Sequence, residues 1–295
     1  MSRPSRRQFV RVAGAGLAAG KLAQAQPGKL TAGEVVDRIK NNLGIPWNDS
    51  TYRDLFRIGG PGAAVVGICT TFGTNLNLMQ RSLQAGLNMI ITHEPTFWTD
   101  ADVVAPGAQA GGTRCDAVCQ ADPLYTLKLD YAIRNNIVVW RIHDHIHRMK
   151  PDRISLGLNR RLNWIQYQVG GSQSRWDIPP TTLGELAKFL ARILQTRSVR
   201  VIGDPNLRVV RVAFGRSLSS MAQAVDCIVA SEGREYDTFE YVRDAALSGA
   251  QKGAIFISHE AHEDPGMEEF AQWLKPFVTE VPVRYISTTD EFWTV

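Results

Sequence analysis

The sequence Ile90-Ile91-Thr92-His93-Glu94-Pro95-Thr96-Phe97-Trp98 decides how the rest of the chain is interpreted. An apolar run that begins at Leu87 ends here on a histidine and a carboxylate. Pro95 disfavours a helical conformation at Glu94, so the run does not continue as a helix. This pattern is typical of a buried parallel strand that delivers polar side chains to the carboxyl edge of a sheet, where α/β proteins place their binding sites.

Two further apolar runs end in the same way. Residues 137–140 lead into a histidine-rich segment at 141–147, and residues 254–257 lead into another at 258–263. All six histidines of the chain lie in these three tails, at His93, His143, His145, His147, His259 and His262. Because the carboxyl ends of parallel strands share one edge of a sheet, we interpret this concentration as a metal site at that edge.

A histidine at the end of a single strand is more often a hydrogen-bonding surface residue than a metal ligand. Three tails of the same form, each with a carboxylate, favour the metal interpretation. His259 and Glu263 are one helical turn apart, so both side chains would face one point if the segment coils after the strand. Imidazole and carboxylate ligands together suit zinc, iron or manganese, and a carboxylate can bridge two ions.

The composition excludes some classes of protein. The chain has 295 residues, 44% of them hydrophobic, which is enough for a full core and for two domains. Five basic residues and no acidic ones precede residue 26; these are Arg3, Arg6, Arg7, Arg11 and Lys21. They leave 28 of the 33 basic residues to face 29 acidic ones, so the remainder is nearly neutral. The formal net charge of +4 therefore gives no electrostatic argument for nucleic-acid binding.

The first 25 residues have the features of an export signal. Ser5-Arg6-Arg7-Gln8-Phe9-Val10 resembles a twin-arginine motif, a Gly- and Ala-rich segment follows at 12–20, and Ala23-Gln24-Ala25 fits a cleavage site. We expect the mature protein to begin near Gln26 and to be soluble in a bacterial periplasm; the alternative is a disordered basic tail. No other segment has the roughly 20 apolar residues that a membrane span requires, so no membrane association is expected after export.

Helical and strand patterns alternate along the chain. Strand patterns at 63–69, 87–92 and 137–142 are separated by helical patterns at 75–85 and 124–135, which predicts right-handed β-α-β connections. Capping boxes at Thr31-Ala32-Gly33-Glu34 and Thr182-Leu183-Gly184-Glu185 predict the start of two more helices. Further strands are predicted at 199–202, 209–214, 226–230, 254–257 and 281–286. Pro265 is expected at the first position of a helix.

This alternation predicts an α/β fold of layered helices and sheets. The polar tails come from both ends of the chain, which indicates that the C-terminal segment completes the first domain. We expect residues 28–150 and 252–295 to form one α/β domain with the metal site, and residues 151–251 to form a second α/β domain inserted into it. Residues 100–121, rich in Gly, Ala, Pro and Asp, are either a mobile flap over the site or a plain surface loop.

The four cysteines divide into two pairs. Cys69 and Cys227 lie in apolar, strand-like runs and are predicted to be core residues. Cys115 and Cys119 lie in the loop-like stretch, and their spacing is not a recognised zinc or redox signature. Cys115 and Cys119 could either form a disulfide or remain two free thiols.

The chain resembles the NIF-three-like dinuclear metal-centre family, also known as GTP cyclohydrolase type-two homologues. The resemblance is carried by residues 91–98, residues 143–147, the sequence Gly203-Asp204-Pro205 and residues 253–266. It implies two similar α/β domains, a toroidal homohexamer, and a centre of two divalent transition-metal ions (zinc, iron or manganese) inside the oligomer. It also implies a small-molecule substrate.

The first and the last of the metal-binding motifs match the family pattern to different degrees. The family usually has two consecutive histidines where this chain has His93 and Glu94. The resemblance therefore implies His93 as a ligand, with the carboxylate of Glu94 in place of a nitrogen. His259 and Glu263 match the family's closing His-x-x-x-Glu without change, which implies that both are ligands.

The middle motif departs from the family pattern. The family has a histidine followed four residues later by an aspartate ligand, whereas this chain has His143 and His147 at those places. Asp144 is the nearest carboxylate and could replace the aspartate by a shift in register. We therefore expect one of Asp144 and His147 to be a ligand, with His143 as a ligand or a supporting residue.

Two glutamates of the second domain are candidates for acid/base catalysis. Glu232 and Glu235 follow a predicted strand, and Arg234 between them could bind an anionic substrate. The alternative is that both carboxylates only stabilise the N-terminus of the following helix through its dipole.

The favoured function is a metal-dependent hydrolase that uses metal-activated water on a small cyclic amide, a nucleotide-like molecule or a phosphoester. A non-catalytic metal-binding or scaffold oligomer is the alternative, and a mononuclear oxidoreductase is least favoured. Catalysis needs an open coordination position beside a cavity, which separates the first two hypotheses. No purine-recognition or phosphate-cradling motif is present in the sequence, so hydrolysis of GTP rests on the resemblance alone.

Overall fold

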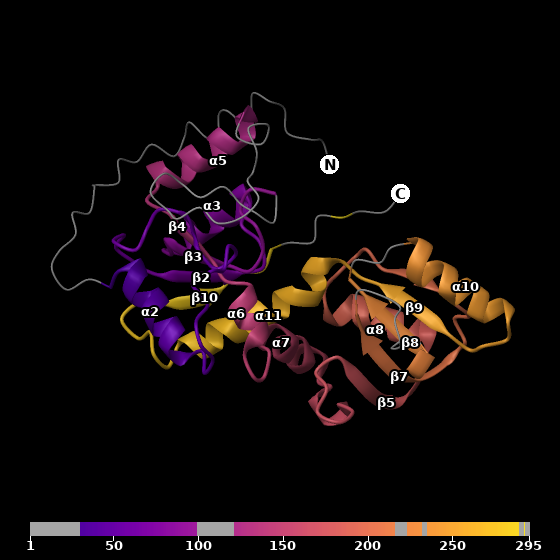
Figure 1. Ribbon diagram of the computed structural model, residues 1–295. Coiled ribbons are helices and arrows are strands. Elements are labelled where there is room, and N and C mark those ends of the chain that lie inside the picture. Colours follow the sequence, from indigo (N-terminus) through magenta and orange to yellow (C-terminus); the bar gives the residue numbers. More distant parts are fainter. Residues whose placement is uncertain (1–29, 99–120, 216–222, 232–234, 289–291, 293–295) are drawn as a thin grey trace.

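The protein consists of two α/β domains, each built on a five-stranded sheet (Figure 1). The computed structural model describes residues 30–98, 121–215, 223–231, 235–288 and 292. The chain forms four strands of the first sheet, then the whole second sheet, and finally returns to add the last strand of the first. The predicted fold class, α/β with a second domain inserted into the first, is confirmed.

The first sheet has the strand order β1-β4-β3-β2-β10. Its strands are β1 (Phe56–Ile58), β2 (Ile68–Thr71), β3 (Met89–Thr92), β4 (Val138–Arg141) and β10 (Val283–Tyr285). All are parallel except β1, which pairs antiparallel with β4. Every residue of β2, β3 and β4 is buried, as in parallel sheets covered on both faces. Thr71 pairs with Thr92, and Thr92 with Arg141, so these three strands end at one edge.

Three helices accompany the first sheet: α2 (Ala32–Asn42), α3 (Leu76–Gln84) and α5 (Pro123–Arg134) (Figure 1). The capping box predicted at Thr31 is present, since its hydroxyl accepts from the Glu34 N–H and Glu34 accepts from the Thr31 N–H. Asn75 and Asp122 cap α3 and α5 with their side-chain oxygens. Local polar side chains therefore set where these helices begin.

The second sheet has the strand order β5-β7-β8-β9-β6. Its strands are β5 (Arg175–Thr182), β6 (Arg200–Ile202), β7 (Arg208–Phe214), β8 (Cys227–Ala230) and β9 (Gly253–Phe256). The three central strands are parallel, and the edge strands β5 and β6 are antiparallel to their neighbours. Helix α8 (Leu183–Ile193) begins after the predicted cap Thr182, and α10 (Glu240–Leu247) follows a π-helical turn at Glu235–Phe239.

The pairing of strand β9 places the boundary between the domains later in the chain than predicted. The sequence pattern assigned residues from 252 onward to the first domain, but β9 pairs with β8 and β6 and so belongs to the second sheet. A buried parallel strand has the same apolar pattern in either sheet, so its pattern does not show which neighbours it joins. The chain returns to the first domain through the helix that follows β9.

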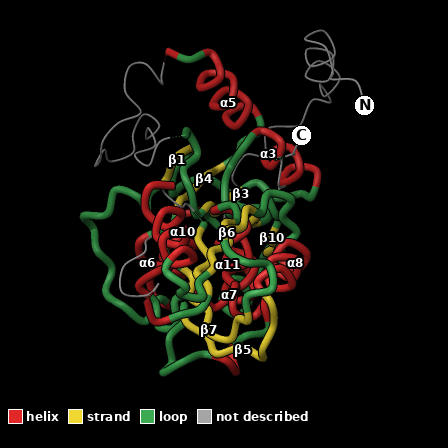
Figure 2. Tube along the Cα trace, turned by 90° about the vertical axis from the view of Figure 1, so that its right-hand side faces the viewer, coloured by secondary structure: helices red, strands yellow, loops and turns green. Residues whose placement is uncertain are grey.

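Two helices connect the domains. Helices α7 (Arg153–Leu162) and α11 (His259–Leu274) pack against each other between the two sheets (Figure 1 and Figure 2). A Cβ atom on Gly157 would lie 2.2 Å from the carbonyl oxygen of Pro265, and one on Gly266 would lie 2.4 Å from the Cα of Ile154. Only glycine allows the two backbones to approach this closely.

The start of α11 differs from the prediction. The helix begins at His259, where the Ser258 hydroxyl accepts from the Ala261 N–H, and Pro265 lies inside the helix rather than at its first position. A proline in a helix interior removes one backbone hydrogen bond, which usually argues against such a helix. Here the helix continues through Pro265, at the point where it packs against α7. As a result, His259 and Glu263 lie one turn apart on the same helix.

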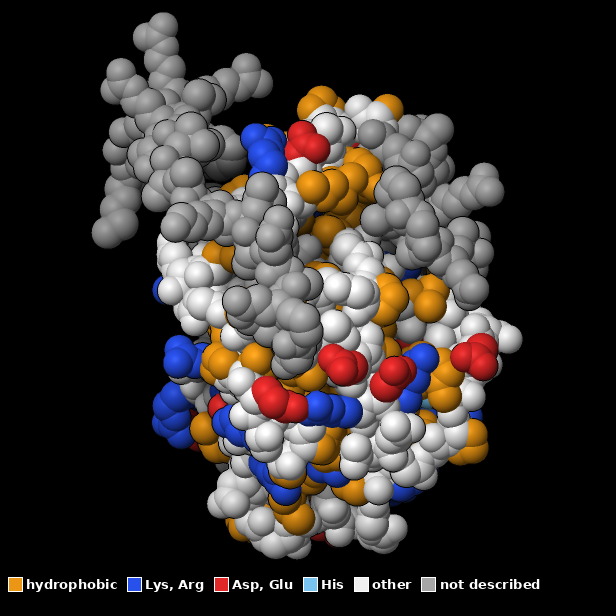
Figure 3. Space-filling view, turned by 90° about the vertical axis from the view of Figure 1, so that its left-hand side faces the viewer, with side chains coloured by type: hydrophobic (Ala, Val, Ile, Leu, Met, Phe, Trp, Pro, Cys, Tyr) orange, Lys and Arg blue, Asp and Glu red, His pale blue; other side chains and the backbone are white. Residues whose placement is uncertain are grey.

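Several predictions fall outside the described residues. They concern the export signal at 1–25, all but the last residue of the stretch 100–121, and Cys115, Cys119, Glu232 and Arg234. Cys69 and Cys227 are buried free thiols, which confirms their assignment to the core. Within the ranges that the structure describes, no helix is both long enough and apolar enough to cross a membrane. On the face shown in Figure 3, acidic and basic side chains lie close together in the lower half.

Candidate metal centre

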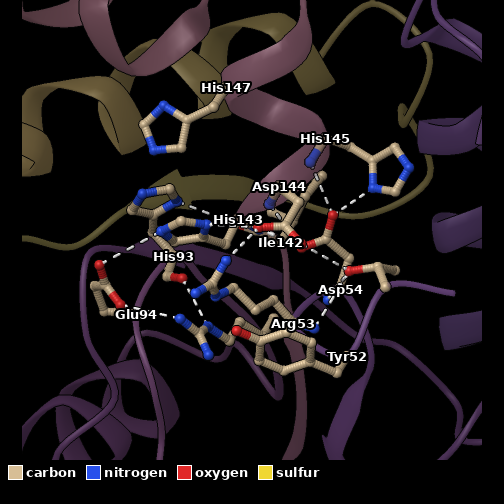
Figure 4. A network of polar contacts seen from close by, with 12 residues as sticks. Tyr52, Arg53, Asp54, His93, Glu94, Ile142, His143, Asp144, His145 and His147 are labelled. Carbon is tan, nitrogen blue, oxygen red and sulfur yellow. Dashed lines mark hydrogen bonds and ion pairs between the residues drawn. The ribbon is translucent and has the colours of Figure 1, made fainter. Parts of the chain in front are cut away.

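The centre lies at the carboxyl edge of the first sheet. His93 and Glu94 directly follow β3, and their backbone N–H groups donate to the carbonyl oxygens of Thr71 and Phe72 at 3.1 and 2.7 Å. The next strand, β4, leads into the short helix α6 (Asp144–Arg148), which carries the middle group of histidines. The adjacent strand ends therefore bring the first two polar tails together (Figure 4).

Three histidines gather there with their rings held in a common way. The Nδ1 atom of His93 lies 3.0 Å from the carbonyl oxygen of Ile142. The Nδ1 atom of His143 lies 3.1 Å from Asp144, and that of His147 lies 3.1 Å from Asp152. Because these oxygens accept hydrogen bonds, they favour a hydrogen on each Nδ1, and a metal ion could then take the lone pair of each Nε2. A ring nitrogen of each histidine lies within 4.8 Å of those of the other two (Figure 4).

Glu263 brings a carboxylate to this cluster from α11. Its Oε2 atom lies 3.2 Å from the Nε2 of His93 and 2.8 Å from the Nε2 of His259. Among the described residues, the buried Nε2 of His93 has no hydrogen-bond partner. A buried ring nitrogen and a buried carboxylate oxygen that face each other in this way form an arrangement that a shared cation would satisfy. Ligand atoms of His93, Glu94 and Glu263 also lie within 4.8 Å of one another.

The carboxylate of Glu94 is divided between two partners. Its Oε2 atom lies 3.1 Å from the guanidinium of Arg141, whose side chain is completely buried. Its Oε1 atom faces the Nε2 atoms of His143 and His259 at 3.8 and 3.6 Å. Arg141 also donates to the carbonyl oxygen of His93 at 3.1 Å. Arg141 therefore balances the charge of Glu94 and leaves one oxygen directed at the histidines.

Burial and neighbouring charges keep this cluster ready for a cation. Burial, together with the nearby rings of His93 and His147, lowers the pKa of His143 to about 3, so its ring is neutral at pH 7. Burial alone would raise the pKa of Glu263, but the facing imidazoles of His259 and His93 lower it well below its ordinary value. Neutral imidazole and ionised carboxylate are the forms that bind metal ions. The residues present therefore fit divalent metal ions.

The structure separates the two candidates for the middle ligand. His147 lies in the histidine group, whereas Asp144 lies against Arg53 at 3.0 Å and Thr51 at 3.2 Å. Asp144 also accepts from His143, and so orients that ring. A carboxylate that fixes the tautomer of a ligating histidine is common around protein metal sites. Six predicted residues thus come together, namely His93, Glu94, His143, His147, His259 and Glu263.

Two histidines of the tails lie elsewhere. The buried ring of His145 stacks on Trp47 with ring centres 3.8 Å apart, and its Nε2 accepts from the backbone N–H of Asn48. His262 stacks on Phe214 with ring centres 5.4 Å apart. Neither residue belongs to a metal-binding group among the described residues.

Asp54 supports the centre and was not identified from the sequence. Its buried carboxylate accepts from the backbone N–H groups of His143, Asp144 and His145 at 2.5, 3.0 and 2.9 Å. It also accepts from the Nδ1 of His145 (Figure 4). His143 makes no side-chain cap to α6, so Asp54 caps this helix from outside. Asp54 lies in a turn-rich stretch without periodicity, and no sequence signal marks it.

The predicted acid/base residues are not part of the cluster. Glu235 is exposed and pairs with Arg200 at 2.9 Å, and Glu232 lies outside the described residues. Arg200 in turn borders a cavity of about 930 Å³. This cavity is lined by the three cluster residues Glu94, His143 and His259 and by residues of the second domain. The cluster therefore lies beside a space large enough for a small molecule.

The fold, in which the second sheet is inserted into the first, is similar to those of several solved structures. Protein SA1388 of Staphylococcus aureus matches with a TM-score of 0.64 and 15% identity, covering 92% of this chain and 100% of that chain. A Bacillus cereus protein related to NIF3 matches with a TM-score of 0.62 and 12% identity, covering 90% and 99%. The chain has the NIF3 fold. A protein of unknown function named ybgI, a further match, has a TM-score of 0.60 and 20% identity, covering 86% and 96%.

The similarity is one of structure. No family model and no curated protein matches the sequence. At these identities the NIF3 fold is established, and the metal centre rests on the geometry of this chain's own histidines and carboxylates.

Proposed function

We propose that this protein is a metal-dependent hydrolase with a dinuclear centre. His93, Glu94, His143, His147, His259 and Glu263 would hold two divalent ions of zinc, iron or manganese. An imidazole nitrogen has one lone pair, so His93 can bind only one ion, whereas each carboxylate can bridge two. Bound ions would supply Lewis acidity, which lowers the pKa of water and polarises an electrophile.

The observation that carries this proposal is the common orientation of three histidines beside a cavity. Each Nδ1 is held by an oxygen, so the Nε2 atoms are presented to the same region. The cavity of about 930 Å³ borders Glu94, His143 and His259 and gives a substrate access to the centre. A purely structural site is closed by its ligands and needs no such space. The substrates to screen are those expected from the sequence, namely small cyclic amides, nucleotide-like molecules and phosphoesters.

The experiment measures metal content and turnover together. The chain is purified without an affinity tag or added metal, and its transition metals are measured by elemental analysis. We expect about two ions per chain, loss of metal in Glu263→Gln, and retention in His262→Gln, which changes a neighbouring residue outside the cluster. No metal and no uptake on titration would refute the centre. Tight metal binding without hydrolysis that depends on metal would refute the catalytic role.

A metal-binding scaffold oligomer is the second candidate. Helix α5 exposes Leu124, Leu127 and Ile133, whose relative exposures are 56%, 40% and 58%. Exposed apolar side chains on one helix support contact with a partner. We propose a homo-oligomer, a hexamer by resemblance, which light scattering on the purified chain would test.

We also propose export by the twin-arginine route, with removal of residues 1–25.

A further inference from the structure

The lining of the cavity next to the candidate metal centre also includes polar residues of the second domain. These are Arg200, Ser198 and Ser231. Arg200 begins the edge strand β6, and Ser231 directly follows β8. The first domain contributes Arg53 to the same lining. The two domains therefore each place a guanidinium against one cavity.

Arg200 is fixed in place although its side chain is 57% exposed. Its Nη1 donates to Glu235 at 2.9 Å. Its guanidinium lies over the rings of Phe239 and Phe256, 5.2 and 5.7 Å from their centres. These two rings stack with centres 4.1 Å apart, which gives the guanidinium a rigid support. A guanidinium held in this way has lost much of its rotational freedom before a ligand binds.

The charged side chains of the lining are the guanidiniums of Arg53 and Arg200 and the carboxylates of Glu94 and Glu260. The carboxylate of Glu94 is paired with Arg141. Arg53 is held by Asp144 at 3.0 Å, as Arg200 is held by Glu235. A planar guanidinium matches the oxygens of phosphate and carboxylate, and serine hydroxyls add hydrogen bonds to the same oxygens.

We propose that Arg200, with Ser198 and Ser231, binds an oxyanion group of the substrate, a phosphate or a carboxylate, while the metal centre acts on another part of the molecule. This inference rests on the proposed function, because it assumes that the metal centre acts on a molecule bound in the same cavity. It gives Glu235 a positioning role, since this carboxylate holds Arg200 and does not reach the histidine cluster. The substrate class is a small anionic molecule with a hydrolysable bond at a distance from its charged group.

The experiment measures the binding of inorganic phosphate and of acetate by calorimetry, on metal-loaded and on metal-free protein. We expect Arg200→Gln to weaken binding of the preferred anion roughly tenfold or more, because one charged hydrogen-bonding group is lost. Arg200→Lys keeps the charge but loses the planar fork, so an intermediate affinity is expected. The preferred probe then identifies the oxyanion as phosphate or carboxylate.

Arg243→Gln is the matched control. Arg243 pairs with Glu240 at 2.9 Å, as Arg200 pairs with Glu235, but it does not line the cavity. Equal anion affinity in wild type and Arg200→Gln, or an equal loss in Arg243→Gln, would overturn the proposal. Metal content is measured in every variant and should not change in Arg200→Gln. Phosphate bound only by the metal ions would be insensitive to Arg200, so failure of the anion site is distinguishable from failure of the metal centre.

Discussion

The Nε2 atom of His93 lies 3.2 Å from the Oε2 atom of Glu263, and both side chains are buried. The two residues are 170 positions apart in the sequence, one after a strand of the first sheet and the other on the helix that leaves the second. Their approach depends on how the two domains pack. A metal ion between them would therefore stabilise the whole fold, and not only one loop.

Metal binding should raise the melting temperature of the wild-type chain. A ligand at 100 times its dissociation constant stabilises the folded state by about 2.7 kcal/mol. We expect a clear upward shift on addition of zinc or manganese, and little shift in Glu263→Gln, which lacks the central carboxylate. Thermal melts with and without metal test this. An equal shift in the Glu263→Gln variant would show that the ions bind elsewhere.

Asp54→Asn should weaken metal binding through the loop that carries His143. Asp54 accepts three successive backbone N–H groups and the ring of His145. Loss of a supporting residue of this kind typically reduces metal affinity about 10- to 100-fold. Titration calorimetry well below the melting temperature measures the affinity of the folded chain. Asp49→Asn, an exposed change in the same stretch, should have no effect.

Gly157→Ala should destabilise the contact between α7 and α11. The added Cβ would lie 2.2 Å from the carbonyl oxygen of Pro265, which the rigid helix cannot avoid without moving. Overpacking of this type costs about 1–3 kcal/mol. Denaturation with urea gives the free energy of unfolding. Gly60→Ala is the control, because nothing lies within 4 Å of its added Cβ, and a similar loss there would contradict the explanation.

Asp226→Asn should remove part of the acid sensitivity of the second domain. Burial alone would raise the pKa of Asp226, but bonds from the Arg211 side chain and from the N–H groups of Arg211 and Val210 lower it. A carboxyl with a lowered pKa stabilises the fold above pH ~4, and this contribution is lost as pH falls through the folded pKa.

At pH 7 we expect Asp226→Asn to lower the free energy of unfolding by about 1–3 kcal/mol. The difference from wild type should shrink as the pH falls below about 4. Urea denaturation at several pH values measures both. Asp244→Asn changes an exposed carboxylate of α10 and is the control. A constant difference at all pH values would refute the role of the Asp226 charge.

Replacement of Arg6 and Arg7 by lysine should block export. A twin-arginine signal is recognised through its paired arginines, which lysine does not replace. Fractionation of cells that produce the full chain should place the wild type in the periplasm, with an N-terminus near Gln26, and the double variant in the cytoplasm. Export of the double variant at the wild-type level would show that residues 1–25 are not a signal of this type.

The sequence alone placed many helices and strands of both sheets, but β1 and β5 were not predicted, and β2 begins at Ile68 rather than at residue 63. Caps such as Thr31 and Thr182 act within one turn, and the period of apolar residues reports local burial. The sequence also indicated which tails carry metal-binding side chains, because a strand that ends in His93 and Glu94 brings these groups to a sheet edge whatever lies beside it. These features depend on residues close together in the chain.

Only the tertiary structure decided how the tails meet. It placed β9 in the second sheet, brought Glu263 to His93, directed Asp144 away from the cluster and brought Asp54 under α6. Each of these depends on packing between segments far apart in the sequence, and the pattern of one segment carries no information about its distant partner. The side chains suited to bind metal were therefore readable from the sequence, whereas the arrangement that would make them one centre was a property of the fold.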